Sequence, residues 1–320
     1  MRSVMLRIQV SVMNPRIVEV CTNNRHLNLY RGFMRVMDSK NEVGRVAISD
    51  IGVLIINAHG VSYSNDLVVS LSMIGVPIVV TGSNHLPVSW LWPAEGNSVQ
   101  AKRMDAQIAC KNPLKKRLWK EIVKAKVVSQ ASLLDALGKP SIPLYSLVKR
   151  VKSGDTTNVE AHAAQRYWTL LFGSNFRRDR GQMGINAMLN YGYTIMRSAV
   201  ARALMGVGLH PTISIFHQNK YNSFRLVDDL MEPFRALVDW HCFHLPEAYN
   251  NIELTPAVKE VFVNILFHKI QGPRGLLSVG NAINEVASSL ATVYQNPNER
   301  LWLPQEYRFD SFPDAKNVRR

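Results

Sequence analysis

The stretch GLHPTISIFHQNKYNSFRLVDDLMEPFR, residues 208–235, joins a loop that carries a histidine to an acidic helix, and the rest of the chain is organised around it. Polar and turn-forming residues follow His217 and lead to Ser223, which we predict to be the N-cap of a helix that begins at Phe224. Apolar residues then recur at spacings of four, four and three, a pattern typical of one buried helix face. The stretch therefore predicts a histidine placed close to an amphipathic helix.

The acidic residues of this helix, Asp228, Asp229 and Glu232, crowd one patch and allow two interpretations. Like charges at helical spacing repel by about 0.2–0.5 kcal/mol per pair unless a positive group lies between them, and a divalent cation is such a group. Alternatively, the aspartates are solvated and Glu232 pairs with an arginine such as Arg225 or Arg235. Spacing alone leaves both interpretations open.

Three segments, in this order along the chain, resemble the signature of the CRISPR-associated protein one family, the metal-dependent integrases that insert new spacers into CRISPR arrays. The segments are NVEAHAAQRYW (158–168), NAMLNYGYTIMRSAV (186–200), and the stretch quoted above with GL-x-P before its histidine and DLMEPFR at its end. A fainter resemblance extends over nearly the whole chain.

The resemblance implies a catalytic metal site. It assigns Glu160, His217 and Glu232 as the ligands of Mg²⁺ or Mn²⁺ and as the catalytic residues. Two carboxylates and one imidazole suit these cations, because carboxylate oxygens prefer hard metals. The implied reaction is transesterification, in which the 3′-hydroxyls of short duplex DNA attack the CRISPR repeat; with water as the nucleophile, the same site is an endonuclease. Asp229 could orient His217 without binding the metal itself.

The resemblance also implies partners. They are double-stranded DNA, as spacer precursor and as CRISPR repeat, a second copy of the chain in a homodimer, and CRISPR-associated protein two. The wording of the motifs is nearest to type II systems, whose effector nuclease would be a further partner. Two rival functions remain, a catalytically silent DNA-binding scaffold and a related integrase encoded by a transposon.

Glu160 has a simpler interpretation that does not need the resemblance. Asn158 is a plausible N-cap, which places Glu160 in the first turn of a helix. An acidic residue there complements the helix dipole whether or not it binds a metal.

The element pattern predicts an α+β fold, with a small β-rich N-terminal domain followed by a larger all-α C-terminal domain. Short apolar runs separated by turn residues predict strands in residues 1–92, which we assign to dimerisation or assembly. Within them, residues 68–80 predict a short helix that leads into a buried strand. A linker over 93–104 and an α-helical catalytic domain over 105–320 follow.

The positive charge is concentrated in the middle of the chain. Residues 93–180 hold seventeen basic and seven acidic residues, and so carry +10 of the net +14. An excess of this size indicates a polyanion, most simply nucleic acid, whereas an anionic membrane would need a larger apolar face beside it. The alternative is that the lysines only solvate the surface.

Two basic groups are the candidate DNA contacts. A helix over 111–126 has a wet face rich in lysine, Lys126 included, and a second group follows the Glu160 helix. The residues predicted to bind nucleic acid are Lys115, Lys116, Arg117, Arg177 and Arg178.

The cysteines and the hydropathy indicate a protein of the reducing cytoplasm. The three cysteines lie far apart without a CxxC pair, and no apolar run is long enough for a signal peptide core or a membrane span. The segment DWHCFH, residues 239–244, has a spacing that could bind zinc, although further ligands are not evident.

Overall fold

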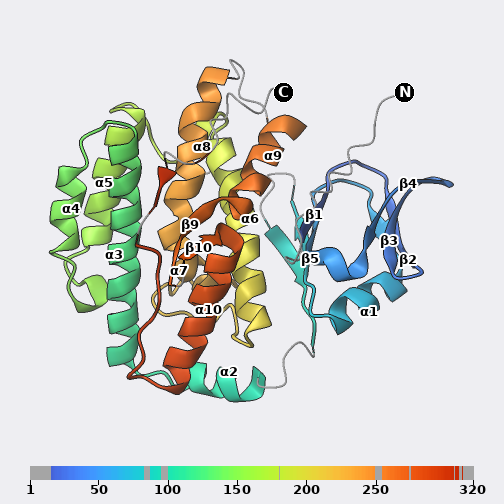
Figure 1. Cartoon of the computed structure of the whole chain (residues 1–320), viewed down its shortest axis with the longest axis horizontal. Helices are drawn as coiled ribbons and strands as arrows, with labels where there is room; N and C mark the ends of the chain where they lie inside the picture. Colours follow the sequence, from blue (N-terminus) through green and yellow to red (C-terminus); the bar gives the residue numbers. More distant parts are fainter. Residues whose placement is uncertain are drawn as a thin grey trace. The chain divides into compact units, whose positions relative to one another are not determined.

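The computed structural model describes residues 16–82, 87–94, 100–179, 181–248, 254–273, 275–305, 307–309 and 312. The chain divides into two compact units, Met1–Gln100 and Ala101–Arg320, and each is described by itself (Figure 1). The first unit is rich in strands and the second in helices, which confirms the predicted α+β class.

The described residues of the first unit form two four-stranded sheets. Its elements are β1 (Arg16–Val20), β2 (His26–Tyr30), β3 (Phe33–Asp38), β4 (Asn41–Ala47), η1 (Ile48–Asp50), β5 (Ile51–Ile56), β6 (Ser62–Tyr63), α1 (Asn65–Met73), β7 (Ile78–Thr81) and β8 (Pro87–Leu91). One sheet has the order β1-β5-β7-β8 and the other β4-β3-β2-β6. The helix and strand predicted within residues 68–80 are α1 and β7.

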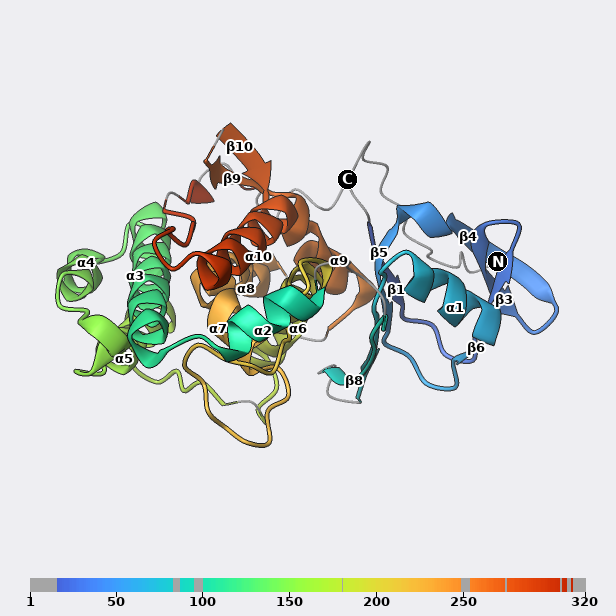
Figure 2. The same cartoon turned by 90° about the horizontal axis from the view of Figure 1, so that it is seen from below.

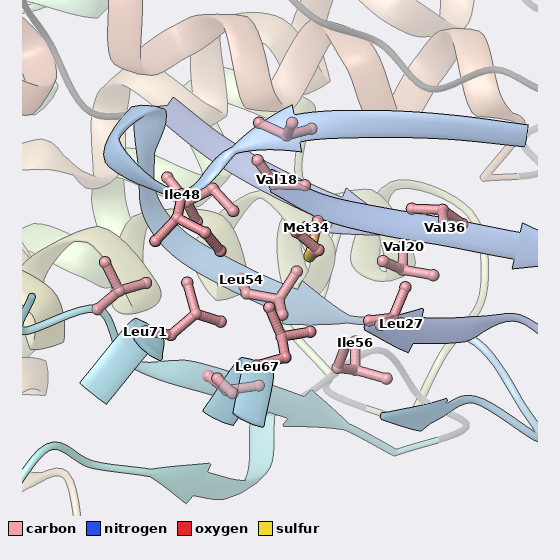
Figure 3. Close-up of a cluster of buried hydrophobic side chains, with 14 residues drawn as sticks. Val18, Val20, Leu27, Met34, Val36, Ile48, Leu54, Ile56, Leu67 and Leu71 are labelled. Atoms are coloured by element: carbon pink, nitrogen blue, oxygen red, sulfur yellow. The ribbon is translucent and has the colours of Figure 1, made fainter. Parts of the chain in front are cut away.

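The two sheets and α1 share one apolar core (Figure 3). Every residue of β5, IGVLII, is buried, as expected for a strand covered on both faces. Leu54 and Ile56 of this strand contribute to the core together with Leu67 and Leu71 of α1. The side chain of Ser64 caps α1 by accepting a hydrogen bond from the Leu67 amide.

Where the structure describes it, the second unit is helical with one short hairpin. Its elements are α2 (Gln100–Ile108), α3 (Asn112–Ala136), α4 (Ile142–Val148), η2 (Ser153–Asp155), α5 (Val159–Phe172), α6 (Ile185–Gly206), α7 (Arg225–Met231), η3 (Glu232–Phe234), α8 (Arg235–Ala248), α9 (Pro256–Asn264), η4 (Ile265–Phe267), β9 (Lys269–Gly272), β10 (Gly275–Ser278) and α10 (Val279–Gln295). The unit is predominantly helical, as predicted, and the short hairpin β9–β10 is added to its helices. Helix α2 begins within the stretch predicted as a linker, residues 93–104.

Two long helices organise the second unit (Figures 1 and 2). Helix α3 packs against α4, α5, α8 and η3, and α6 packs against α7, α8, α9 and α10. Most residues of α6 are buried on all sides of the helix, which identifies it as the central helix. Among the described residues, no helix is long and apolar enough to span a membrane.

Candidate active site

Lys126 of α3 is the cation around which the candidate site is built. Its side chain is only 10% exposed, and its ammonium nitrogen lies 2.6 Å from Glu160 Oε1 and 2.6 Å from Glu232 Oε2. The prediction that Lys126 belongs to the wet face of its helix was therefore wrong. Helix α3 continues to Ala136 and packs against both α5 and η3, and this packing buries the side of the helix that carries Lys126.

Glu160 reaches Lys126 from the first turn of α5, and that turn is held by Asp155. The Asp155 carboxylate accepts hydrogen bonds from the backbone amides of Val159 and Glu160, each at 2.9 Å. Asn158 occupies the N-cap position, but its side chain makes no capping hydrogen bond and its backbone is left-handed, with φ of 52°. The predicted cap by Asn158 is thus replaced by a carboxylate three residues earlier.

Glu232 reaches Lys126 from the tight turn η3 that joins α7 to α8. It is almost fully buried, and its second oxygen, Oε1, lies 2.9 Å from the Arg235 guanidinium. Burial alone would raise the pKa of Glu232, but Arg235 and Lys126 outweigh it and lower that pKa to about 2. The two glutamates likewise overcome burial and raise the pKa of Lys126. We call Lys126, Glu160, Glu232 and Arg235 the charged cluster.

One oxygen of this cluster is held by Lys126. Glu232 Oε2 is buried, and the Lys126 ammonium lies 2.6 Å away as its ion-pair partner. A carboxylate oxygen has more than one lone pair, so an ion pair with one ammonium does not use its full capacity for cations.

His217 is held beside the charged cluster by Asp229. Its Nδ1 lies 2.6 Å from Asp229 Oδ1, and the fully buried Asp229 carboxylate also accepts hydrogen bonds from the amides of Ile215, Phe216 and His217. This hydrogen bond to Asp229 raises the pKa of His217, against the effect of burial, and the charge of Glu232 adds to the rise. The carboxylate on Nδ1 fixes the orientation of the ring. Nε2 is the ring nitrogen that this hydrogen bond does not occupy.

The three carboxylates of 228–232 do not crowd one patch, so that prediction was wrong. Asp228 lies 2.8 Å from Arg197 and accepts from Asn222, while Asp229 faces His217 and Glu232 faces Lys126 and Arg235. Each carboxylate has its own donor, which removes the repulsion expected from their spacing. The predicted pairing of Glu232 with an arginine is confirmed for Arg235.

The predicted start of this helix was also displaced. Helix α7 begins at Arg225, and Phe224 takes the N-cap position without a capping side chain. Ser223 is not the cap. The Asn222 side chain accepts from the Phe224 amide and so shapes the turn that precedes the helix.

Aromatic side chains border the site beside His217. The Phe216 ring stacks on Trp119 of α3 with centroids 4.2 Å apart, and Trp119 also meets the His217 ring edge-on. Phe216 is 43% exposed, whereas Trp119 is buried. Helix α3 therefore supplies both the cation of the charged cluster and the platform under the histidine loop.

A second layer fixes Arg235. Its guanidinium lies over the Tyr193 ring, 4.7 Å from the centroid. The hydroxyls of Tyr193 and Tyr167 both donate to Asp239, at 2.5 and 2.6 Å. Burial raises the pKa of Asp239 to about 6, against the effect of these hydrogen bonds.

Lys126 is the member of the site that the sequence analysis placed on an exposed helix face.

The donor set fits a hard cation in part. Glu160 and Glu232 already hold a positive group between them, as ligands of Mg²⁺ or Mn²⁺ would. Among the described residues, however, no group of three His, Cys, Asp or Glu side chains is close enough together to hold a metal ion. The structure thus brings the predicted ligands Glu160 and Glu232 to one cation and places His217 within electrostatic reach of Glu232, without closing a three-ligand site among the described residues.

The segment DWHCFH is not a metal site on the same criterion. His244 Nδ1 bonds to the Trp240 carbonyl, one turn earlier in α8. His241 is buried against His268, with ring centroids 5.0 Å apart, and neither nitrogen of His241 has a hydrogen-bond partner among the described residues. We call His241 and His268 the imidazole pair.

The predicted DNA contacts differ in how accessible they are. Lys116, Arg117 and Arg177 are exposed, and Lys115 is half-buried. Arg178 is also half-buried, and its guanidinium donates to the side chains of Asn186 and Asn190. Arg178 therefore has a structural task that the sequence did not indicate.

Comparison with known proteins gives a consistent result. The family model of CRISPR associated protein Cas1 matches residues 18–250. The CRISPR-associated endonuclease Cas1 of Neisseria meningitidis serogroup C is 33% identical over 297 residues, which cover 90% of this chain and 97% of that protein.

Solved structures share the fold at lower identity. A casposase bound to an integration product is 19% identical, with a TM-score of 0.75 and 95% of each chain covered. A chain of a Cas6-RT-Cas1–Cas2 complex is 14% identical, with a TM-score of 0.73 over 92% of this chain and 36% of that chain.

Proposed function

We propose that this protein, which belongs to the Cas1 family of CRISPR-associated proteins, is a metal-dependent integrase that joins the 3′-hydroxyls of short duplex DNA to a CRISPR repeat. The observation that carries the proposal is that the half-buried Glu160 and the buried Glu232 meet at one cation near an oriented histidine. Buried carboxylates are costly unless a positive group offsets them, so such a pair marks a cation site.

Glu160, Glu232 and His217 would hold Mg²⁺ or Mn²⁺. When bound, the metal supplies a Lewis acid on the reacting phosphate and stabilises the oxygens that enter and leave. The protein supplies the rest. Asp229 keeps His217 in one orientation, and Arg235 holds the second oxygen of Glu232, so the ligands are positioned before the substrate arrives.

The reaction needs no external energy source, because one phosphodiester is exchanged for another. The hydroxyl attacks the repeat phosphate, and the new P–O bond forms as a P–O bond of the repeat strand breaks. The released oxygen leaves as a hydroxyl of the repeat strand and takes up the proton that the attacking hydroxyl gives up. With water in place of the hydroxyl, the same residues perform hydrolysis, which is the endonuclease activity that the name of the Neisseria relative states.

The partners follow from the same reasoning. We propose that the protein binds double-stranded DNA, both spacer precursor and repeat, and acts as a homodimer through its β-rich first unit. Cas2 is the proposed heteromeric partner, since a structure with this fold is described as a complex with Cas2. In a type II system the effector nuclease would join this assembly.

An integrase of a transposon is the second candidate, because a casposase shares the fold over 95% of the chain. The chemistry would be the same and only the target would differ. A casposase-like enzyme would join terminal repeats of its own element in preference to a CRISPR repeat.

The decisive experiment is the joining of a labelled short duplex to a plasmid that bears the repeat. We expect joining with Mn²⁺ or Mg²⁺ and none with a chelator. Glu160→Ala, His217→Ala and Glu232→Ala should each lower the rate at least about 1,000-fold while DNA affinity stays within a few-fold. Glu121→Ala, which removes an exposed pair with Lys124 on α3, is the matched control and should join normally.

Two outcomes would count against the proposal. Activity that persists in chelator would remove the metal from the mechanism. DNA binding without joining under any metal would favour the silent scaffold.

The DNA path has a separate test. Removing a side chain that neutralises one phosphate should reduce the slope of log affinity against log salt by about 0.9 on duplex DNA. Replacing Lys115, Lys116 and Arg117 by glutamine should therefore weaken binding equally for repeat and random sequence. Arg177→Gln should act in the same way and could also slow joining, whereas Arg178→Gln should cost stability because it breaks the bonds to Asn186 and Asn190. An unchanged salt slope for both groups would place the DNA elsewhere.

A further inference from the structure

The charged cluster is already neutral without any metal. Lys126 and Arg235 contribute two positive charges, and Glu160 and Glu232 contribute two negative charges. All four groups are largely shielded from water, and the Glu160 side chain is 20% exposed. A divalent cation added to this cluster would therefore create an excess of two positive charges in a poorly solvated place.

We propose that Lys126 is the resident counterion of the metal site: its ammonium holds Glu160 and Glu232 together until a divalent cation binds, and it leaves both carboxylates when the cation arrives. The inference rests on the proposed function and deepens it. It makes Lys126 a positioning residue that competes with the metal, and it explains why a site without metal does not push its glutamates apart.

Distance supports displacement. The ammonium lies 2.6 Å from one oxygen of each glutamate, so those two oxygens are at most 5.2 Å apart, twice that distance. Mg²⁺ binds oxygen at about 2.0–2.1 Å, which requires it to enter the space between the same oxygens. An ammonium left in contact with both oxygens would lie within a few ångströms of the metal, where the two cations repel.

Of the two cations in the cluster, Lys126 is the one able to leave. Arg235 is bonded to Glu232 Oε1 and lies over the Tyr193 ring, so it is held from two directions. Lys126 is a compact charge on a flexible four-carbon stem, and its ammonium is held by its ion pairs with Glu160 and Glu232. Those two ion pairs are the contacts that exchange with a metal would break.

The test is the binding of Mn²⁺ to the full chain, measured by calorimetry, beside thermal unfolding in chelator. Lys126→Met keeps the length of the side chain and removes its charge. We expect it to bind Mn²⁺ at least about tenfold more tightly than the wild type, because no ion pair must be broken first. In chelator it should unfold several degrees lower, because the buried Glu232 and the half-buried Glu160 lose a shared partner.

Lys124→Met is the matched control, since Lys124 lies on the same helix and pairs with the exposed Glu121. It should change neither property. Combining Lys126→Met with Glu160→Gln should abolish the gain in affinity, because one of the two carboxylates no longer attracts the metal.

Lys126→Arg covers the case in which Lys126→Met does not fold. A guanidinium keeps the charge and grips carboxylates more firmly, so Mn²⁺ should bind more weakly than in the wild type. Equal Mn²⁺ affinity in the wild type and in the Lys126 variants would overturn the counterion role and leave the metal site standing. Absence of Mn²⁺ binding from all of these proteins would overturn the metal site itself.

Discussion

The charged cluster and the imidazole pair are two buried polar groups in the same unit, and they meet the cost of burial in opposite ways. In the charged cluster every group keeps its charge, because an opposite charge lies within about 3 Å. In the imidazole pair, burial lowers the pKa of His241 well below 6.5 and that of His268 to about 4, so both rings are neutral near pH 7. In these two places, a shielded group stays charged only where an oppositely charged group lies next to it.

This difference in charge distinguishes a group of residues that can take part in function from one that only packs. The carboxylates of the charged cluster stay ionised and can therefore attract a cation. They include the residues that we propose bind the metal. The imidazole pair has lost the property that makes histidine useful, and it packs among aromatic rings such as Phe312, which lies 4.7 Å from His268. We therefore expect substitutions in the two places to behave differently.

The largest difference should appear when one partner is removed from the charged cluster. Glu232→Ala leaves Lys126 and Arg235 buried beside a single carboxylate, and we expect the free energy of unfolding to fall by about 3–5 kcal/mol. Denaturant unfolding in chelator at pH 7.5 measures it. Glu121→Ala should change the free energy by less than about 0.5 kcal/mol. A decrease below about 1 kcal/mol for Glu232→Ala would show that the cluster is well solvated.

The next largest difference concerns acid. A base whose pKa is lower in the folded protein than in the unfolded chain contributes stability that is present above the unfolded pKa, about 6.5, and is lost as the pH falls towards the folded value. For His268 this window runs from 6.5 to about 4, and each unit of pKa difference is worth about 1.4 kcal/mol at full effect. Glu232, with a pKa of about 2, stays ionised throughout the window.

The test compares the wild type with His241→Leu between pH 8 and pH 4.5. The wild type should lose more stability than the variant over this range, because the variant has one buried imidazole fewer to protonate. The raised pKa values of His217 and Asp239 act in the opposite direction, but they are common to both proteins and cancel in the comparison. Parallel pH profiles would show that His241 is protonated as easily in the folded protein as in the unfolded chain.

The sequence predicted the parts of this architecture that depend on local pattern. Apolar periodicity placed a long helix over residues 186–205, and α6 spans Ile185–Gly206. Turn residues between short apolar runs predicted the β-rich first unit. The motifs indicated Glu160 and Glu232, and the structure brings both to one cation.

What the sequence did not predict depends on contacts between distant segments. Lys126 is 34 residues from Glu160, and nothing in the lysine-rich pattern of its helix distinguishes it from its exposed neighbours. Its burial follows from the way α5 and η3 pack on α3, which periodicity does not encode. Asp155 replaced Asn158 as the capping side chain for a similar reason, because a carboxylate in the preceding turn reached two amides at once.

The smallest effect is expected for the imidazole pair at alkaline pH, where both rings are neutral in folded and unfolded chains alike. His241→Leu removes two ring nitrogens that have no hydrogen-bond partner among the described residues, and replaces them with apolar atoms of similar volume. Because no partner is left unsatisfied, the free energy of unfolding at pH 8 should change by less than about 1 kcal/mol, in either direction. DNA joining should proceed at the wild-type rate. Denaturant unfolding and the joining assay measure the two quantities on the same preparation. A decrease of more than about 2 kcal/mol would mean that His241 has a polar partner of its own. The imidazole pair would then no longer differ from the charged cluster in the way argued here.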